Sequence, residues 1–370
     1  MPRWLGYPRL SLLLLLLVRP VDAAEVDTFT WRERALSDAY ATLNREVNRR
    51  LQYALRRANG QARMLADRRH SKTRRPVFAS QQGLTYCNVD YLYDAVSDFL
   101  GGALIGELEQ WAEESVELDR LTVPFEASIY QDFLFDETPS ITGSKRVASV
   151  LNVQGVRMGT DKLGHFFTEG RSYFEKYQVG LSFADVLLFG EQTEILFFGS
   201  LTTGVYSFAD LAANMNGFRF WNALLAQSSD PMSHESVAPY MVCHEQAWQQ
   251  VRAFEFRDYV DVAWDESLNC NQFRNSDLLG KMLQRMDADV YCQLSAEQVT
   301  ALRAKYGDLY AHIVNPKGLI VMPQSQQAYA LLDEYIHSER GQRKPRWMIS
   351  ILLKFRDRLK RFVDNVPFPY

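Results

Sequence analysis

The stretch GTDKLGHFFTEGRSYF (residues 159–174) decides the fold we expect, because it has the pattern of a helix that carries polar groups on an apolar surface. The polar residues at its start supply the cap with which helices commonly begin. In such a helix Asp161, His165 and Glu169 follow one another at intervals of four residues and share one face. The neighbouring residues are mostly apolar, so we expect this face to be partly buried, which alters the pKa values of histidines and carboxylates.

A second stretch, GEQTEILFFG (190–199), places Glu191 and Glu194 within a highly apolar helical pattern. Burying an unpaired carboxylate is expensive. We therefore expect at least one of these two glutamates to meet a partner inside the fold.

A third stretch, YSFADLAANMNGFRFW (206–221), begins with Ser207, a good amino-terminal cap for a helix. Asp210 and Asn214 then lie four residues apart on one helical face, and Gly217 would let another backbone approach closely. Three consecutive helices thus carry polar groups in apolar settings, which predicts one shared polar centre.

Apolar residues recur every three or four positions over most of the remaining chain, as they do in amphipathic helices. This spacing predicts one long helix from Trp31 to Asn59, two shorter helices over 90–119 and further helices over 243–313. Residues 123–158 mix β-branched and turn residues, and are expected to form loops or a small strand pair. The expected fold class is mainly α: a multi-helix globular protein with disulfides and little or no β structure.

The first residues, MPRWLGYPRLSLLLLLLVRPVDAAEV, have the order of a secretory signal peptide: a basic start, an apolar middle and small residues near the cut. The apolar run is shorter than the roughly 20 residues that cross a bilayer, so a retained membrane anchor is the weaker alternative. We expect an exported protein, periplasmic or peripheral to a membrane. The net charge of −4 gives no reason to expect nucleic acid as a partner.

The four cysteines would meet an oxidising environment in an exported chain, and their wide spacing favours two disulfides over a zinc site. Three pairings are possible. We favour Cys270 with Cys292, because both lie in one short region; this pairing leaves Cys87 for Cys243.

The carboxyl end, residues 341–370, carries eight Lys or Arg against two Asp, with apolar residues on one stripe. Such a basic amphipathic helix, over 343–363, could lie on an anionic membrane surface. The alternative is a terminal helix that packs on the body with its basic face in water. The expected organisation is 1–24 signal peptide, 25–150 amino-terminal helical region, 151–230 helical core with the polar site, 231–340 carboxyl-terminal helical region and 341–370 basic tail.

The order of the polar residues resembles the VanZ-like and YfiM-like bacterial envelope proteins, whose signature is Asp-Lys-x-x-His-Phe, a later Glu, then Ser-x-x-Asp-x-x-x-Asn/Asp-x-x-Gly. The matching positions are Asp161, Lys162, His165, Phe166, Glu194, Ser207, Asp210, Asn214 and Gly217. VanZ-like members are generally integral membrane proteins, whereas the helices of this chain are too polar for lipid contact. The resemblance therefore points to the soluble YfiM-like branch. It implies an envelope role and brings no established reaction.

Two mechanisms fit these residues. A divalent metal held by Asp161, His165, Glu169 and Asp210 would activate water for hydrolysis. Alternatively, His165, held by Asp161 or Asp210, would be the general base and Glu194 the acid, on an envelope glycan or lipid-linked substrate. A third interpretation has the polar residues fix the helix packing. The two functions to weigh are thus a hydrolase of peptidoglycan, its precursors or an envelope lipid, and a non-enzymatic envelope factor that binds a lipid or a protein partner.

A second acidic group occurs in FRDYVDVAWDESLNC (256–270), where Glu266 stands beside four residues that fall roughly along one helical face: Asp258, Asp261, Asp265 and Asn269. The spacing does not match a calcium loop. We expect a solvated acidic face that pairs with the basic tail.

Overall fold

The computed structural model describes residues 25–71, 86–102, 106–195, 199–200, 202–286, 292–315 and 317–322, with the backbone alone for 62–71. The expected signal peptide (1–24) and basic tail (341–370) lie outside these ranges, so both stay predictions. In the part that is described, no helix is both long and apolar enough to cross a bilayer.

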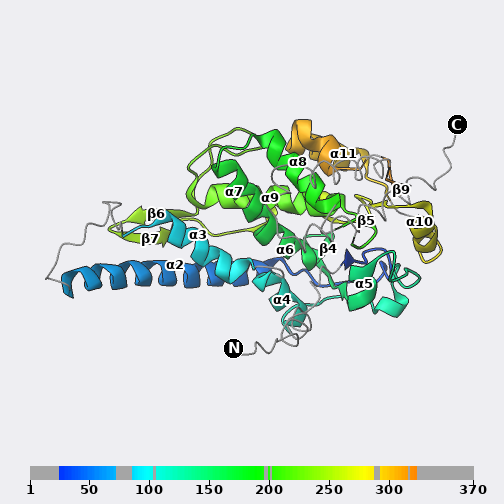
Figure 1. Ribbon diagram of the computed structural model, residues 1–370, viewed down its shortest axis with the longest axis horizontal. Helices are drawn as coiled ribbons and strands as arrows, with labels where there is room; N and C mark the ends of the chain where they lie inside the picture. The colour runs from blue at the N-terminus through cyan, green and yellow to red at the C-terminus, as the bar shows by residue number, and fades with distance from the viewer. Residues whose placement is uncertain are drawn as a thin grey trace, which may run out of the picture.

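Helix α9 (Phe208–Leu225) lies at the centre of the fold, and every residue in it except Arg219 and Leu225 is buried (Figure 1). Ser207 caps it as predicted, because its side chain accepts a hydrogen bond from the amide of Asp210. Apolar residues occur on all sides of α9, and its buried polar residues include Asp210 and Asn214, so the helix can lie only inside the protein with partners for these groups.

The stretch that begins at Gly159 continues through α6 (Asp161–Gly164), a π-helical turn (His165–Glu169) and α7 (Gly170–Gln178). These elements cross α9 very closely. A Cβ atom on Gly217 would lie 1.9 Å from the carbonyl oxygen of Phe166, and one on Gly170 would lie 2.6 Å from the backbone of Gly217. The predicted role of Gly217 in a close backbone approach is therefore confirmed.

Helix α2 (Tyr40–Ser71) runs along one edge of the molecule and packs against α3 (Val89–Leu100) (Figure 1). The prediction of a helix over 31–59 was wrong at both ends. Trp31 has a positive φ of 52°, which no α-helix contains, and Gly60 lies inside α2 with no atom within 4 Å of its Cβ position. A glycine in a helix costs about 1 kcal/mol, which does not end a helix that neighbouring turns support.

The fold is mixed α/β, so the expectation of little or no β structure was wrong. Nine short strands form four sheets among the described residues. Three sheets have two strands each: β1 (Glu25–Val26) with β2 (Val147–Ala148), β3 (Val150–Val153) with β4 (Val156–Gly159), and β6 (Met241–His244) with β7 (Ala247–Gln250). In the fourth sheet, β8 (Gln272–Phe273) lies between β5 (Val205–Tyr206) and β9 (Ile320–Val321). Strands of two to four residues are too short to show the alternation that identifies a strand.

Two antiparallel hairpins illustrate what the sequence did and did not signal. The β3–β4 hairpin confirms the strand pair expected within 123–158, and it leads directly into α6. The β6–β7 hairpin lies where helices were expected. Its turn residues, Glu245 and Gln246, have positive φ values of 48° and 66°, so the chain reverses direction there instead of forming a helix. Such turns usually contain Asn-Gly or Asp-Gly, so this one carried no recognisable signature.

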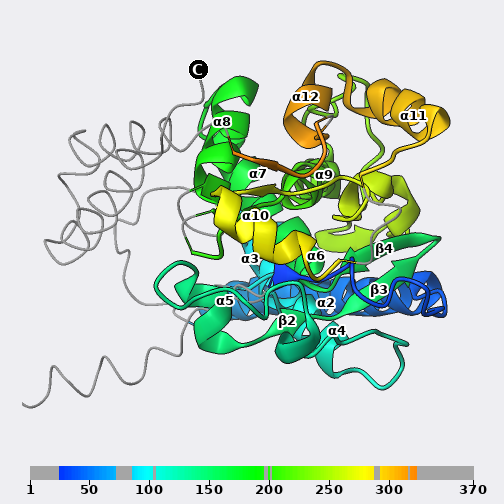
Figure 2. The ribbon, with the colours of Figure 1, turned by 90° about the vertical axis from the view of Figure 1, so that its right-hand side faces the viewer.

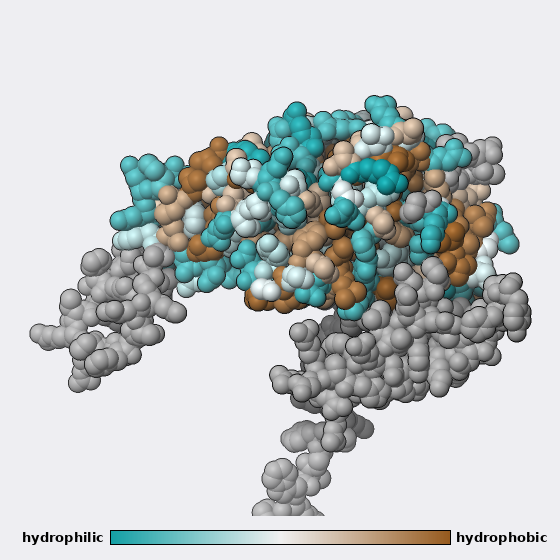
Figure 3. All heavy atoms as spheres, turned by 90° about the horizontal axis from the view of Figure 1, so that it is seen from above, coloured by the Kyte–Doolittle hydropathy of each residue, from teal (hydrophilic) through white to brown (hydrophobic). Residues whose placement is uncertain are grey.

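The remaining elements complete the body around α9. They are α4 (Glu107–Glu114), α5 (Pro139–Ser144), α8 (Phe183–Thr193), α10 (Ser276–Leu283), α11 (Ala296–Tyr306) and α12 (Tyr310–Ile313). Helices α11 and α12 lie on the side of the molecule opposite α2 (Figure 2). On the face over α11, hydrophilic and hydrophobic residues are intermixed (Figure 3).

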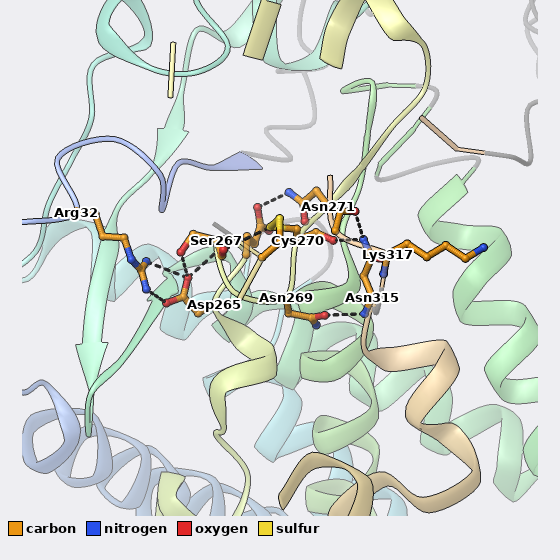
Figure 4. Close-up of a disulfide and its surroundings, with 11 residues drawn as sticks. Arg32, Asp265, Ser267, Asn269, Cys270, Asn271, Asn315 and Lys317 are labelled. Atoms are coloured by element: carbon orange, nitrogen blue, oxygen red, sulfur yellow. Dashed lines mark hydrogen bonds and ion pairs between the residues drawn. A yellow bond between two sulfur atoms is a disulfide. The ribbon is translucent and has the colours of Figure 1, made fainter. Parts of the chain in front are cut away.

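Both favoured disulfides are present, Cys87–Cys243 and Cys270–Cys292. The second lies beside the segment that carries Glu266 (Figure 4). The amide of Cys292 donates to the carbonyl of Ser267, and Asn315 donates to the carbonyl of Cys270. This disulfide thus holds the 265–271 segment in place at the polar centre.

Candidate functional site

Lys162, from the first turn of α6, lies at the centre of the predicted polar site and is fully buried. Its ammonium nitrogen Nζ lies 2.7 Å from Asp161 Oδ2, 2.5 Å from Asp210 Oδ1 and 2.6 Å from Glu266 Oε1. An ammonium has three N–H donors. Here Nζ donates hydrogen bonds to Asp161 and Glu266, whereas its contact with Asp210 Oδ1 is an ion pair without hydrogen-bond geometry. Burial lowers the pKa of Lys162, but the three carboxylates outweigh burial and raise it well above its usual value, so the side chain is a permanent cation.

His165 lies at the edge of this centre, with 15% of its side chain exposed. Its Nε2 atom is 3.1 Å from Asp210 Oδ2, so Asp210 joins the imidazole to Lys162. Burial lowers the pKa of His165, but the charge of Asp210 and their hydrogen bond raise it, to about 10. Burial raises the pKa of Asp210, but His165 and Lys162 together lower it well below its usual value.

Asn214, which was predicted to share one helical face with Asp210, contacts the other imidazole nitrogen. Its amide lies 3.1 Å from His165 Nδ1 and 3.2 Å from the backbone carbonyl oxygens of His165 and Asp210. With its nitrogen toward these carbonyls, the amide donates to them and to a bare Nδ1, and its oxygen accepts from the hydroxyl of Tyr173 at 3.3 Å. With its oxygen toward Nδ1, it accepts a hydrogen bond from a ring that carries a proton on Nδ1. The first orientation satisfies both ends of the amide. In that orientation Asn214 favours an imidazole without a proton on Nδ1, which is a neutral ring, whereas Asp210 favours the charged one.

The start of α9 brings two glutamates to the same centre. The amide of Ser207 donates to Glu194 Oε1 at 3.0 Å, and its hydroxyl donates to Glu266 Oε1 at 2.9 Å. Burial, followed by the charge of Asp210, raises the pKa of Glu194 to about 8. This confirms the expectation that Glu191 or Glu194 has a partner inside the fold. Glu191 instead lies near the surface, where its Oε1 is 2.7 Å from Nδ1 of His312.

Glu266 is the site residue that the sequence interpretation misplaced. It was assigned to a solvated acidic face, yet it is fully buried and accepts from Asn271 at 2.6 Å. Its pKa is raised to about 7, because burial outweighs the lowering effect of Lys162. The 256–270 stretch forms short 3₁₀ turns rather than one helix, and Asp265 pairs at 2.7 Å with Arg32. The expected helical face therefore does not exist.

Two further carboxyl groups adjoin the centre and had no signal in the sequence. Burial raises the pKa of Glu109, from α4, to about 8, with a further contribution from the charge of Asp161. Glu25, in β1, is buried with its pKa raised well above the usual value, first by burial and then by the charges of Glu266 and Asp210. Neither residue lies near Asp161 in sequence, so only the tertiary fold places them here.

Asp161, His165 and Asp210 each offer one ligand atom within 4.8 Å of the others, which is the geometry of a small metal site. Glu169, the fourth predicted ligand, is not in this group. It is the last residue of the wider π-helical turn, which shifts it out of the spacing of an α-helix. The ammonium of Lys162 lies against both aspartates, so a divalent ion bound there would stand beside a fixed positive charge. The predicted metal is therefore poorly matched to this cluster.

Comparisons with known proteins identify no relative: no family model, no curated protein and no solved structure matches the chain. The resemblance to VanZ-like and YfiM-like proteins thus rests on the motif residues alone and stays a prediction.

Proposed function

We propose that this chain is an exported cell-envelope hydrolase that uses His165 and Asp210 for general acid–base catalysis. One observation carries the proposal: a partly exposed histidine is paired with a buried aspartate, whose charge is fixed in turn by a buried lysine. This is the arrangement in which a third group orients and tunes an acid–base residue.

The energetics of the cluster support a role in function rather than in stability. Replacing a buried ion pair by apolar residues is often neutral or stabilising. Here one ammonium is surrounded by three carboxylates, and Asp161 Oδ1 is buried without a hydrogen-bond donor among the described residues. Strongly shifted pKa values and π-helical turns both concentrate at functional sites.

Each group has a definite task in this proposal. His165 exchanges a proton with the attacking water or the leaving group, because Asp210 stabilises its charged form and Asn214 its neutral form. Lys162 keeps Asp210 ionised and supplies the positive charge that a metal would otherwise provide. Glu194 also holds a proton at neutral pH and is a second proton donor beside His165. The substrate class, peptidoglycan, its precursors or an envelope lipid, follows from the expected compartment.

The test is product release from three purified substrates: peptidoglycan sacculi, a lipid-linked precursor and envelope phospholipid. The unaltered protein should release products from one of them, and His165→Gln should lose about 100-fold or more of that activity. His312→Gln is the matched control, since His312 is exposed and pairs only with Glu191 at the surface among the described residues. Equal activity of His165→Gln and the unaltered protein would overturn the catalytic role.

A second candidate is the non-enzymatic envelope factor, which binds a lipid or protein partner and uses the polar centre to fix its helices. Both nitrogens of His165 already have protein partners, and only 15% of its side chain is exposed, which favours this candidate. Here none of the three substrates would be cleaved, while His165→Gln would lower the stability of the protein without changing partner binding.

A further inference from the structure

The outward face of α2 carries a row of arginines. One stripe of the helix consists of side chains that are exposed at intervals of four, three and four residues: Arg45, Arg49, Gln52 and Arg56. The opposite side faces the core through buried apolar residues: Leu43, Val47, Leu51, Ala54, Leu55 and Ala58. We call the stripe, together with the adjacent exposed residues Tyr53 and Arg57, the basic face.

The arginines of this face outnumber the carboxylates that pair with them. Arg49 shares Glu46 with Arg50, with N–O distances of 2.6 Å in both pairs. Arg45 pairs with Glu117, and Arg57 pairs with Asp98, and all four side chains are more than half exposed. Such exposed pairs are weak and exchange readily for other anions.

Arg56 differs from the other arginines, because no described carboxylate pairs with it. Its guanidinium lies over the ring of Tyr53 at 4.6 Å from the centroid, and that of Arg49 lies at 5.6 Å from the same centroid. Tyr53 is 36% exposed between them. An exposed tyrosine flanked by cations suits the boundary between water and lipid headgroups, where its ring is partly buried and its hydroxyl stays hydrated.

We propose that the basic face of α2 binds the surface of a bilayer that contains anionic phospholipid. The helix spans 32 residues, or about 48 Å, and Arg45 to Arg56 covers about 17 Å of it. A straight, convex row of charges matches a flat, extended array of phosphates rather than a single small anion, which requires a concave site. Helix α2 lies along one edge of the molecule, where such a surface can approach it (Figure 1). This contact is independent of the acid–base chemistry proposed for His165.

The test measures sedimentation of the purified protein with vesicles of equal parts phosphatidylglycerol and phosphatidylcholine, and with vesicles of phosphatidylcholine alone. Binding should require phosphatidylglycerol and weaken as salt is added. Arg49→Gln/Arg56→Gln should weaken binding about 25-fold, since each arginine near an anionic surface contributes about fivefold. Glu46 keeps its pairing with Arg50 in this variant, so the fold is preserved.

The matched control is Arg303→Gln/Lys317→Gln, which removes the same charge from two exposed residues outside α2. It should bind anionic vesicles as the unaltered protein does. Equal binding by the α2 variant and this control would overturn the proposal and leave the interaction to another surface, such as residues 343–363. Tighter binding to a short DNA duplex than to the vesicles, lost in the α2 variant, would also overturn it, because the face would then recognise a polyanion rather than a bilayer.

Discussion

Lys162 Nζ lies 2.6 Å from Glu266 Oε1, although the two residues are 104 positions apart and both are fully buried. The same ammonium contacts Asp161 from α6 and Asp210 from α9. One side chain therefore connects three segments of the chain. Because Asp210 also binds His165, the positions of the lysine and of Glu266 set the electrostatics of the proposed acid–base pair.

Removing the charge of Lys162 should destabilise the protein strongly. Lys162→Met keeps most of the side-chain volume but leaves three buried carboxylates without their cation, and breaking a buried pair in this way costs about 3–5 kcal/mol. Urea unfolding at neutral pH measures the loss. Lys145→Met is the control, because that side chain is 63% exposed and its nearest carboxylate is 3.9 Å away; it should change the stability by less than about 0.5 kcal/mol. If Lys162→Met also changes the stability by less than about 0.5 kcal/mol, the three carboxyl groups around Lys162 are protonated in the folded protein.

The sequence predicted the helical half of this centre because the relevant signals are local. The cap at Ser207, the spacing of Asp210 and Asn214, and the close approach at Gly217 are properties of one helix and its neighbours. Asp161 and His165 likewise follow from their separation of four residues. Such patterns are visible in a few consecutive residues.

The other half of the centre depends on contacts that no local pattern records. Glu25 and Glu109 reach the centre through long-range packing, and Glu266 does so from a turn after a 3₁₀ helix, in a stretch that was predicted to be one helix. The two-residue strands β1 and β2 are likewise fixed by a parallel pairing across more than 100 positions. Both the β content and the number of carboxyl groups at the site are therefore larger than the local patterns indicate.

Replacing Glu194 by glutamine should change the dependence of stability on pH. The pKa of Glu194 is about 8 in the folded protein, against an ordinary value of 4.5. The folded protein thus holds a proton that the unfolded chain loses, so this group lowers stability as pH rises from 4.5 to 8. Glu194→Gln removes that loss and can still accept from Ser207. Between these pH values, urea unfolding should show the folding equilibrium constant of the variant rising, relative to that of the unaltered protein, by up to about tenfold per pH unit. A constant difference would contradict the raised pKa.

Gly217→Ala should be severely destabilising, because the new Cβ would lie 1.9 Å from the carbonyl oxygen of Phe166 and α9 would have to move away from the π-helical turn. We expect a loss of at least about 3 kcal/mol, at the upper end of overpacking effects. Gly280→Ala in α10 is the matched control, since no atom lies within 4 Å of its Cβ position. It should stabilise the protein by about 0.5–1 kcal/mol through helix propensity. Thermal unfolding of both variants makes the comparison, and a loss for Gly217→Ala no larger than about 1 kcal/mol would refute the close crossing.

The two disulfides should differ in what their removal costs. Cys87–Cys243 closes a separation of 156 residues and Cys270–Cys292 one of 22. A chain-entropy account predicts a loss of about 5 kcal/mol for the first and about 3 kcal/mol for the second. Paired Cys→Ser variants, compared by urea unfolding, measure the order. The shorter bridge should have the larger effect on activity, because it holds the segment of Glu266, and an activity loss confined to the longer bridge would contradict that role.

The charge of His165 should depend on Asp210. In the unaltered protein the pKa of the imidazole is raised to about 10, so the ring stays charged at neutral pH. The charged ring, paired with Asp210, contributes to the stability of the folded protein. That contribution is fully present below about pH 6.5 and is lost as pH rises through 10. In Asp210→Asn, burial and the nearby ammonium of Lys162 still disfavour the charged ring, so the pKa should fall below 6.5. Nuclear magnetic resonance of the imidazole signals across pH 5–10 follows both titrations. An unaltered ring that titrates near 6.5 would mean that Asn214, with its nitrogen toward Nδ1, outweighs Asp210 and that His165 serves as a base rather than as an acid at neutral pH.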